Sequence, residues 1–323
     1  MKAAIVEAAG RTPVYGDYIE PTRESGSELI SVRTAALSHF TKGRASGAHY
    51  SADGIFPAIV GADGVGVTQD GRRVYFVLPK APYGAMAEKT TVRSEQCIDV
   101  PPAVDDITAA AIANPGMSAW AALAERAHFK HGETVLINGA TGAAGRLAVQ
   151  IAKYMGAAKI IATGRDEQAL EEVRALGADV VIPFKLDALH PHGAKEYEDA
   201  LKAQLSMGLD VVVDYLWGKS AETVIVAIAK AVEDATPVRF VHVGGASGDD
   251  IRLPGAALRS SPIVLMGSGN KSIPFSRLLA AIKSVFEAIG PASLQIATKS
   301  VPLSLVEETW NDDGKARVVF IVS

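Results

Sequence analysis

Short apolar runs alternate with helical patterns through the central part of the chain, from about Ala109 onward. Runs of this length that are continuously apolar are typical of strands covered by helices on both faces. Helical connections make successive strands parallel, so the pattern predicts an α/β fold with a doubly wound parallel sheet. The six predicted strands are Val135–Ile137, Ile160–Ala162, Val180–Ile182, Asp210–Val213, Phe240–Val243 and Ile263–Met266.

Apolar spacing and capping residues predict the helices around these strands. Leu147, Ile151 and Met155 recur every four residues and form one buried face. Asp166 can cap a helix over Glu167–Leu176. Further helices are expected to begin near Ser118 and Gly145, and an amphipathic helix is expected over Phe275–Ile289.

The N-terminal part of the chain has a different pattern, in which turns separate short strands. Leu29–Arg33, Val65–Thr68 and Arg73–Val77 are strand-like, and Gln69–Gly71 is a turn signal between two of them. This pattern predicts a compact, mostly β domain, to which two strand-like pieces near the C-terminus are expected to return. The predicted domains are therefore residues 1–113 with 269–323, and residues 114–268.

Composition narrows the class of protein. The 323 residues suggest two domains at about 150 residues each. A net charge of −4 without a basic run argues against nucleic-acid binding as a main role. Cys97 is the only cysteine, so no internal disulfide can form, which fits a cytoplasmic protein. The apolar run within Met1–Glu7 is too short for a signal peptide, and we expect no membrane span.

A glycine-rich turn joins the first of the six strands to a helix. Alanine takes the first position of the usual G-x-G-x-x-G pattern. Gly142 lets the backbone approach a phosphate, Gly145 lets the helix pack closely on the strand, and the N–H groups of the helix start face the anion. The turn therefore predicts a dinucleotide site, the alternative being a tight turn that binds nothing. The candidate contacts are Ala140, Thr141, Gly142, Ala143, Ala144 and Gly145.

The tip of the second strand selects the cofactor. NAD sites usually carry Asp or Glu there, about 20 residues past the glycines. Here Gly164 has no carboxylate to repel a 2′-phosphate, and the guanidinium of Arg165 can pair with one. The sequence therefore predicts NADP(H), with Asp166 interpreted as a helix cap and not as a ribose ligand. The alternative for Arg165 is an ordinary solvated arginine.

Several further segments carry motifs of a known family. These are Phe56–Gly66, Gly84–Glu88, Gly116–Trp120, Asp210–Asp214 and Gly314–Val319. In order and spacing they resemble the medium-chain dehydrogenase/reductase superfamily, and within it the zinc-independent quinone oxidoreductase branch. The resemblance covers nearly the whole chain. It implies a GroES-like, mostly β catalytic domain and a Rossmann cofactor domain.

The resemblance also implies site residues on the substrate side. The family's Asn and Asp, three residues apart, are matched here by Ser38 and Thr41, with His39 and Tyr50 as further candidates. We expect Ser38 and Thr41 to orient the substrate or the cofactor ribose. The alternative for this pair is turn chemistry at the edge of the domain.

Further cofactor contacts follow from the topology and the resemblance together. Ligands bind at the carboxyl ends of parallel strands, and the fifth and sixth predicted strands end in small residues that in the family line the nicotinamide half. Turn geometry alone is the alternative for these glycines. Gln168 and Phe184 match the Lys and Tyr with which many members hold the 2′-phosphate, so Arg165 carries that task largely alone. The additional candidates are Asn114, Ser118, Val243, Gly244, Gly245, Gly267, Ser268 and Gly269.

No metal site is predicted. The places of the zinc ligands in zinc-dependent relatives are matched by Ser38, by Ala62–Asp63 and by a later stretch without cysteine. Zinc needs a tetrahedral set of Cys, His or carboxylate ligands, which these positions lack. We interpret His190 and His192 as solvated, and His39 and His49 as polar lining.

These observations predict an enzyme that transfers hydride from NADPH to a quinone or an α,β-unsaturated carbonyl. Such acceptors are already activated, so the cofactor carries the chemistry and hydrogen bonds to the developing oxyanion help most. Alternatives are a zinc-free carbonyl or alcohol dehydrogenase, an enoyl-thioester reductase, and a non-catalytic NADPH-binding protein. The apolar final strand, Ile263–Met266, is an edge that needs protection, so we expect a homodimer.

Overall fold

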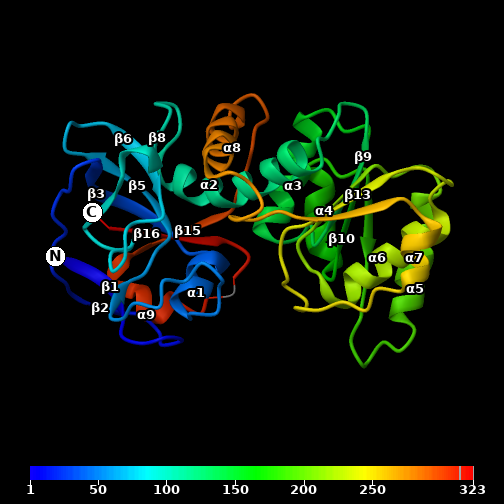
Figure 1. Cartoon of the computed structure of the whole chain (residues 1–323), viewed down its shortest axis with the longest axis horizontal. Helices are drawn as coiled ribbons and strands as arrows, with labels where there is room; N and C mark the ends of the chain where they lie inside the picture. Colours follow the sequence, from blue (N-terminus) through cyan, green and yellow to red (C-terminus); the bar gives the residue numbers. More distant parts are fainter. Residues whose placement is uncertain (313, 323) are drawn as a thin grey trace. The chain divides into compact units, whose positions relative to one another are not determined.

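The computed structural model describes residues 1–312 and 314–322 and separates into two compact units (Figure 1). The first unit comprises Met1–Asn114, Val285–Ile289 and Gln295–Ser323. The second comprises Pro115–Ser284 and Gly290–Leu294. The first predicted boundary, at 113/114, lies one residue before this division. The second predicted boundary, at 268/269, lies before the place where the chain returns to the first unit. That place is between Ser284 and Val285, inside helix α8 (Phe275–Ala288).

The first unit consists mainly of antiparallel strands with short helices. Within the described residues it holds a three-stranded sheet, β2-β1-β4, and a seven-stranded sheet in which β15-β16-β3-β5-β6-β8 form the path and β7 also pairs with β3. Its strands are β1 (Lys2–Val6), β2 (Val14–Asp17), β3 (Ser27–Ala36), β4 (Ala58–Ile59), β5 (Asp63–Thr68), β6 (Arg73–Val77), β7 (Lys89–Arg93), β8 (Cys97–Asp99), β15 (Thr298–Pro302) and β16 (Arg317–Ile321). Its short helices are α1 (His39–Ala45), η1 (Ser94–Gln96), η3 (Leu303–Leu305) and α9 (Val306–Thr309).

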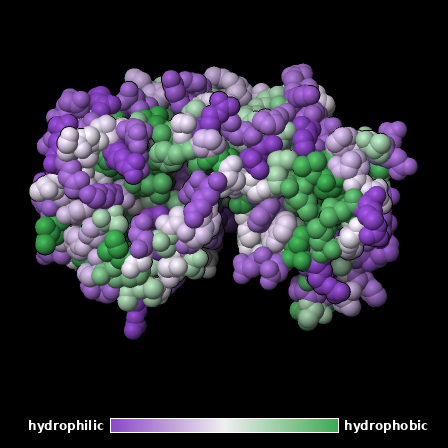
Figure 2. Space-filling model, viewed as in Figure 1, coloured by the Kyte–Doolittle hydropathy of each residue, from purple (hydrophilic) through white to green (hydrophobic). Residues whose placement is uncertain are grey.

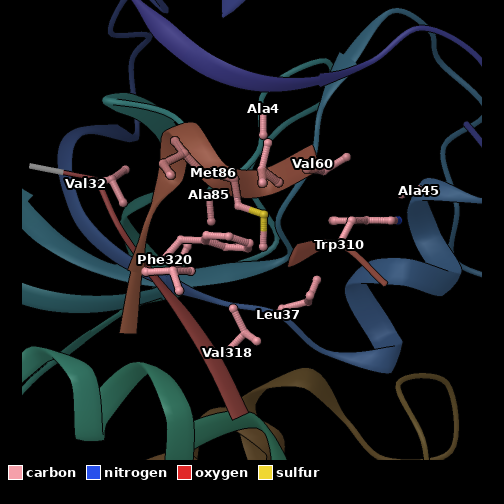
Figure 3. Close-up of a cluster of buried hydrophobic side chains, with 14 of the residues drawn as sticks. Ala4, Val32, Leu37, Ala45, Val60, Ala85, Met86, Trp310, Val318 and Phe320 are labelled. Atoms are coloured by element: carbon pink, nitrogen blue, oxygen red, sulfur yellow. The ribbon is translucent and has the colours of Figure 1, made fainter. Parts of the chain in front are cut away.

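The core of the first unit joins residues from both ends of the chain. Figure 3 shows Met86 and Val60 from the N-terminal part close to Trp310 and Phe320 from the C-terminal part. Phe320 is fully buried, and β16 pairs antiparallel with β3. The prediction that the C-terminal strands return to the first domain is therefore confirmed.

The second unit is built on a parallel sheet. Its order within the described residues is β11-β10-β9-β12-β13-β14, and every neighbouring pair is parallel. The chain starts in the middle, builds outward in one direction and then returns to build in the other, as a doubly wound fold requires. All six predicted strands are confirmed: β9 (Thr134–Asn138), β10 (Lys159–Gly164), β11 (Val180–Pro183), β12 (Val211–Asp214), β13 (Val238–His242) and β14 (Ile263–Gly267).

Helices cover this sheet because their apolar faces need burial. Leu136 and Ile161 of the sheet pack in one cluster with Leu201 and Val224 from two helices. In α3, Leu147 and Ile151 are fully buried, whereas Met155, the predicted third member of that face, is only partly buried and ends the helix. The helices are α3 (Ala143–Tyr154), α4 (Glu167–Ala175), α5 (Gly193–Leu205), α6 (Gly218–Ala231) and α7 (Gly255–Ser260).

The expected helix start near Ser118 is wrong. Helix α2 spans Asp106–Trp120, continues as a π-helical turn over Ala121–Arg126, and has Pro115 in its interior. Asp105 precedes this helix, and its carboxylate accepts hydrogen bonds from the Thr108 N–H at 2.9 Å and the Thr108 hydroxyl at 2.6 Å. An acidic residue in that position is a local capping signal.

Among the described residues, no helix is both long and apolar enough to cross a bilayer.

Candidate functional site

The glycine-rich turn lies where β9 ends and α3 begins. The N–H groups of Gly139 and Ala140 donate to the Thr163 carbonyl at 3.2 and 2.9 Å, which fixes the turn to the end of β10. Gly142 is the N-cap of α3, and no side chain caps this end. The first N–H groups of a helix have no partner within it, so this end of α3 offers donors and a positive dipole end to an anion.

The two glycines of the turn have different surroundings. A Cβ at Gly145 would lie 2.3 Å from the Gly139 carbonyl oxygen, so any side chain there would push α3 away from the strand. A Cβ at Gly142 would meet only the Gly139 oxygen, at 3.9 Å. The surface at Gly142 is therefore open, which lets the protein backbone come close to a phosphate of the ligand. The turn fits the pyrophosphate of a dinucleotide.

The tip of β10 excludes a carboxylate by packing. A Cβ at the buried Gly164 would lie 2.7 Å from the Thr141 methyl group. Asp166 is the N-cap of α4 and accepts a hydrogen bond from the Ala169 N–H at 2.9 Å, so its interpretation as a cap is confirmed. Arg165 between them is exposed, and within the described chain its guanidinium has no hydrogen-bond or ion-pair partner.

A buried polar network, which the sequence analysis missed, lies beneath the turn. Asn138 at the end of β9 donates to Asp214 at 2.7 Å and to Ser220 at 2.6 Å. Its side-chain oxygen accepts from the hydroxyls of Thr163 at 2.7 Å and Tyr197 at 3.2 Å. Burial raises the pKa of Tyr197, so the phenol stays protonated and donates. The network ties the carboxyl ends of β9, β10 and β12 together. The sequence signal for this network was Asn138, a polar residue at the end of an otherwise apolar strand.

The loops after β13 and β14 contain the remaining glycine candidates. A Cβ at Gly244 would lie 3.2 Å from the Tyr215 oxygen, and one at Gly245 would lie 3.0 Å from the Gly248 oxygen, so both are crowded by backbone. Gly267 has open space around it. The N–H of Val243 donates to the Asp214 carbonyl at 2.7 Å, that of Ser268 to the His242 carbonyl at 2.8 Å, and that of Gly269 to the Ser272 hydroxyl at 2.8 Å.

A strained residue lies on the loop between β12 and α6. Trp217 has φ 57° and ψ −153°, a backbone region that is essentially reserved for glycine. Such a conformation costs about 1–3 kcal/mol and persists only where the surroundings enforce it. The Trp217 N–H donates to the buried Asp214 carboxylate at 3.1 Å. Its indole stacks on His242, with ring centroids 4.2 Å apart.

Asn114 and Ser118 both lie on α2. The Ser118 hydroxyl donates to the Pro115 carbonyl at 2.9 Å. At the start of β5, the Asp63 carboxylate accepts a hydrogen bond from the Tyr75 hydroxyl at 2.9 Å, and the Asn114 side chain is among the polar groups that act on it. Burial raises the pKa of Asp63, and the charge of Arg317 and these polar groups oppose the rise. The expected role of Asn114 near a carboxamide stays a prediction.

The substrate-side candidates lie at the start of α1 in the first unit. Ser38 caps this helix, because its hydroxyl accepts from the Thr41 N–H at 2.9 Å. The Ser38 hydroxyl also donates to Thr41 Oγ1 at 3.0 Å, and the Ala62 N–H donates to the same oxygen at 3.4 Å. With its oxygen accepting twice, Thr41 keeps its own hydroxyl proton to donate. His39 is exposed.

A small pocket opens beside this pair. Its cavity volume is about 60 Å³, and Thr41, Arg44, Phe56 and Tyr83 are among the residues that line it. Tyr50 is 57% exposed and stacks on His49 with ring centroids 4.2 Å apart. Burial lowers the pKa of His49, and the Arg44 charge adds to this. The structure therefore brings Ser38 and Thr41 together and gives Tyr50 a separate partner.

Known proteins resemble this chain over all or part of its length. A family model described as zinc-binding dehydrogenase matches residues 143–267. A probable NADPH-dependent quinone reductase from Emericella nidulans is 26% identical over 100% of both chains. The chloroplastic NADPH-dependent alkenal/one oxidoreductase of Arabidopsis thaliana is 28% identical over 83% of this chain and 74% of its own. The quinone oxidoreductase from Thermus thermophilus shares the fold, with a TM-score of 0.81 at 24% identity and 100% of both chains covered.

These similarities support the predicted resemblance to the medium-chain dehydrogenase/reductase superfamily. The predicted recognition is confirmed, including the quinone-reductase-like branch. The predicted α/β fold class is also confirmed, with its parallel Rossmann-like sheet and a second, antiparallel-rich sheet.

The zinc-binding description of the matched superfamily model does not carry a ligand set into this chain. Residues 143–267 contain no cysteine, because the only one is Cys97 in β8. Burial raises the pKa of the Cys97 thiol to about 11, which disfavours the thiolate that a metal needs. Throughout residues 1–312 and 314–322, no three His, Cys, Asp or Glu side chains are grouped so as to hold a metal ion.

Proposed function

We propose that this chain binds NADPH and reduces a quinone or an α,β-unsaturated carbonyl. The tip of β10 carries the cofactor choice. Gly164 cannot accept the carboxylate of an NAD site without colliding with Thr141, and Arg165 is exposed without an internal partner in the described chain. A guanidinium in that state can pair with a 2′-phosphate through two parallel hydrogen bonds. The two relatives named above are a probable NADPH-dependent quinone reductase and an NADPH-dependent alkenal/one oxidoreductase.

We assign dinucleotide binding to the second unit, which contains residues 115–268 of the predicted domain, whereas the proposed contact Asn114 is the last residue of the first unit's N-terminal segment. The turn between β9 and α3 holds the pyrophosphate, and Arg165 holds the 2′-phosphate. The loops after β13 and β14 take the nicotinamide half. The proposed contacts are Asn114, Ser118, Ala140, Thr141, Gly142, Ala143, Ala144, Gly145, Gly164, Arg165, Val243, Gly244, Gly245, Gly267, Ser268 and Gly269.

We assign the acceptor side to the first unit. NADPH supplies the hydride when it is bound. The Thr41 hydroxyl donates a hydrogen bond to the acceptor oxygen, where negative charge grows. Ser38 holds Thr41 in place through the two hydrogen bonds that join them. His39 and Tyr50 stay proposed further contacts, and the final proton can come from water.

We further propose that the reaction needs no zinc. Ser38 and Ala62 stand where zinc-dependent relatives are expected to have ligands, and neither a hydroxyl in a helix cap nor a methyl group is a zinc ligand of the usual kind. A quinone or an α,β-unsaturated carbonyl is already activated, so its reduction does not need a Lewis acid. Oxidation of a simple alcohol would be hard without one. Cytoplasmic location is proposed as well, since a chain with a single cysteine suits a reducing compartment.

A homodimer through β14 completes the proposal. β14 is an edge strand of the six-stranded sheet among the described residues, and Val264 is 48% exposed. Figure 2 shows an apolar patch in the region where β14 runs in Figure 1. An exposed apolar edge strand of this kind pairs readily with a second copy.

The decisive experiment measures oxidation of NADPH and of NADH against simple quinones, 2-alkenals and alcohols, with and without a chelator. We expect chelator-resistant turnover of a quinone or an enal, with NADPH preferred. Turnover lost on chelation would contradict the zinc-free proposal. NADPH binding without turnover of any acceptor would show a non-catalytic binding protein.

A further inference from the structure

Trp217 is the bulkiest non-glycine residue with a positive φ among the described residues, and it stands at a ligand-binding edge. The other four are Leu78, His128, Ala235 and Ser293. Trp217 follows the carboxyl end of β12, next to the central strand β9, and ligands of doubly wound sheets bind at that edge. Backbone strain at such an edge points to a function, because stability alone would favour glycine there.

Two interactions hold Trp217 in this conformation. Its N–H donates to the carboxylate of Asp214, which is fully buried and is itself fixed by the Asn138 amide at 2.7 Å. Its ring stacks on His242 at 4.2 Å and meets Phe240 edge-on at 6.3 Å. His242 Nδ1 lies 3.4 Å from Asp214 Oδ2, so ring and backbone are anchored to the same carboxylate.

The loop that Trp217 fixes touches both neighbouring loops of the proposed cofactor site. Leu216 packs on the turn after β9, where a Cβ at Gly139 would lie 2.8 Å from Leu216 Cγ. The Leu216 carbonyl accepts from the Ser247 N–H at 2.7 Å, and the Tyr215 carbonyl accepts from the Ala246 N–H at 3.2 Å. The loops after β9, β12 and β13 are therefore connected through residues 215–217.

We propose that Trp217 is a positioning residue for the dinucleotide: its enforced conformation sets the three loops in their binding arrangement before the cofactor arrives. This inference rests on the proposed NADPH site. Glycine at position 217 would remove the strain but would also release the loop, and cofactor binding would then have to order it. If Trp217 only filled the core, its substitution would change the stability of the protein and leave the affinity for NADPH unchanged.

The test measures NADPH dissociation constants by fluorescence titration, with thermal unfolding of the cofactor-free protein alongside. We expect Trp217→Gly to bind NADPH about tenfold more weakly, because the loop must be ordered on binding. Trp217→Phe keeps an aromatic ring and should stay within about twofold of the wild type. The matched control is Ala235→Gly, which relieves a positive φ of 62° on an exposed residue at the amino end of β13. It should leave the affinity unchanged.

Affinity of Trp217→Gly within twofold of the wild type would overturn the inference. So would an equal loss in Trp217→Phe, which would indicate direct contact between the indole and the cofactor. If the glycine variant does not fold, His242→Ala removes the stacking partner and leaves Trp217 in place. It should weaken NADPH binding about threefold or more, and unchanged affinity overturns the inference. A wild-type protein that fails to bind NADPH would refute the proposed function instead.

Discussion

At the scale of single residues, cofactor choice depends on what surrounds a strand tip. Gly164 has no room for a side chain because of the Thr141 methyl group, and Arg165 has no internal partner among the described residues. A cation that is already paired would have to break that pair to hold a phosphate. Within the described chain, Arg165 has no ion pair to break, so the free energy of its hydrogen bonds to the 2′-phosphate contributes fully to binding.

Arg165→Ala should raise the KM for NADPH about tenfold and change the KM for NADH less than twofold, because only NADPH carries the phosphate. Initial rates at fixed acceptor concentration measure this. Arg259→Ala, which removes an exposed arginine in the last turn of α7, is the control for loss of one positive charge. Equal effects on the two cofactors would contradict the assignment of Arg165.

Thr41→Val removes one hydroxyl and keeps the shape of the side chain. We expect kcat/KM for the acceptor to fall about tenfold or more, with NADPH affinity unchanged, because the donor to the developing oxyanion is lost. Steady-state kinetics and a binding titration separate the two effects. The control is Thr90→Val, because Thr90 Oγ1 is buried without a hydrogen-bond partner in the described chain. Unchanged kcat/KM in Thr41→Val would refute the proposed role.

At the scale of elements, the turn between β9 and α3 separates structural from functional glycine. Gly145 is required by the close approach of the Gly139 oxygen, whereas Gly142 is surrounded by open space. Both positions carry the same residue in the same motif. Their surroundings assign packing to one and ligand approach to the other.

Gly145→Ala should lower the free energy of unfolding by about 1–3 kcal/mol, since the added methyl group overpacks the contact between helix and strand. Gly142→Ala should cost no more than about 1 kcal/mol, the difference expected at an N-cap. It should nevertheless weaken NADPH binding at least about tenfold, since the methyl group occupies the phosphate approach. Urea denaturation and NADPH titration of both variants check this. Normal NADPH affinity in Gly142→Ala would contradict the site.

At the scale of the whole molecule, β14 leaves an apolar edge on the parallel sheet. Val264 is 48% exposed on this strand. Charged side chains on an edge strand are an established way to prevent pairing between copies.

Val264→Lys should convert the expected homodimer to a monomer, as measured by multi-angle light scattering. Val14→Lys is a closely matched control, because Val14 is 47% exposed on β2, an edge strand of the three-stranded sheet. That variant should stay dimeric. A monomeric wild-type protein would refute the assembly proposal outright.

The sequence by itself determined the six parallel strands, the glycine-rich turn, the Asp166 cap and the tip formed by Gly164 and Arg165. Each of these depends on a local property: apolar periodicity, backbone freedom at glycine, or a side chain bonding its own helix end. The start of α2 at Asp106 was local as well, and the capping signal of Asp105 was overlooked.

Only the tertiary structure decided which polar groups share an environment. Asn138, Tyr197 and Ser220 meet in one network although they are far apart in sequence, and Ser38 proved to cap α1 while it holds Thr41. The strain at Trp217 depends on Asp214 and His242, which belong to two neighbouring strands. No periodicity encodes such contacts, because they arise from the order in which strands pair and from the space that packing leaves between them.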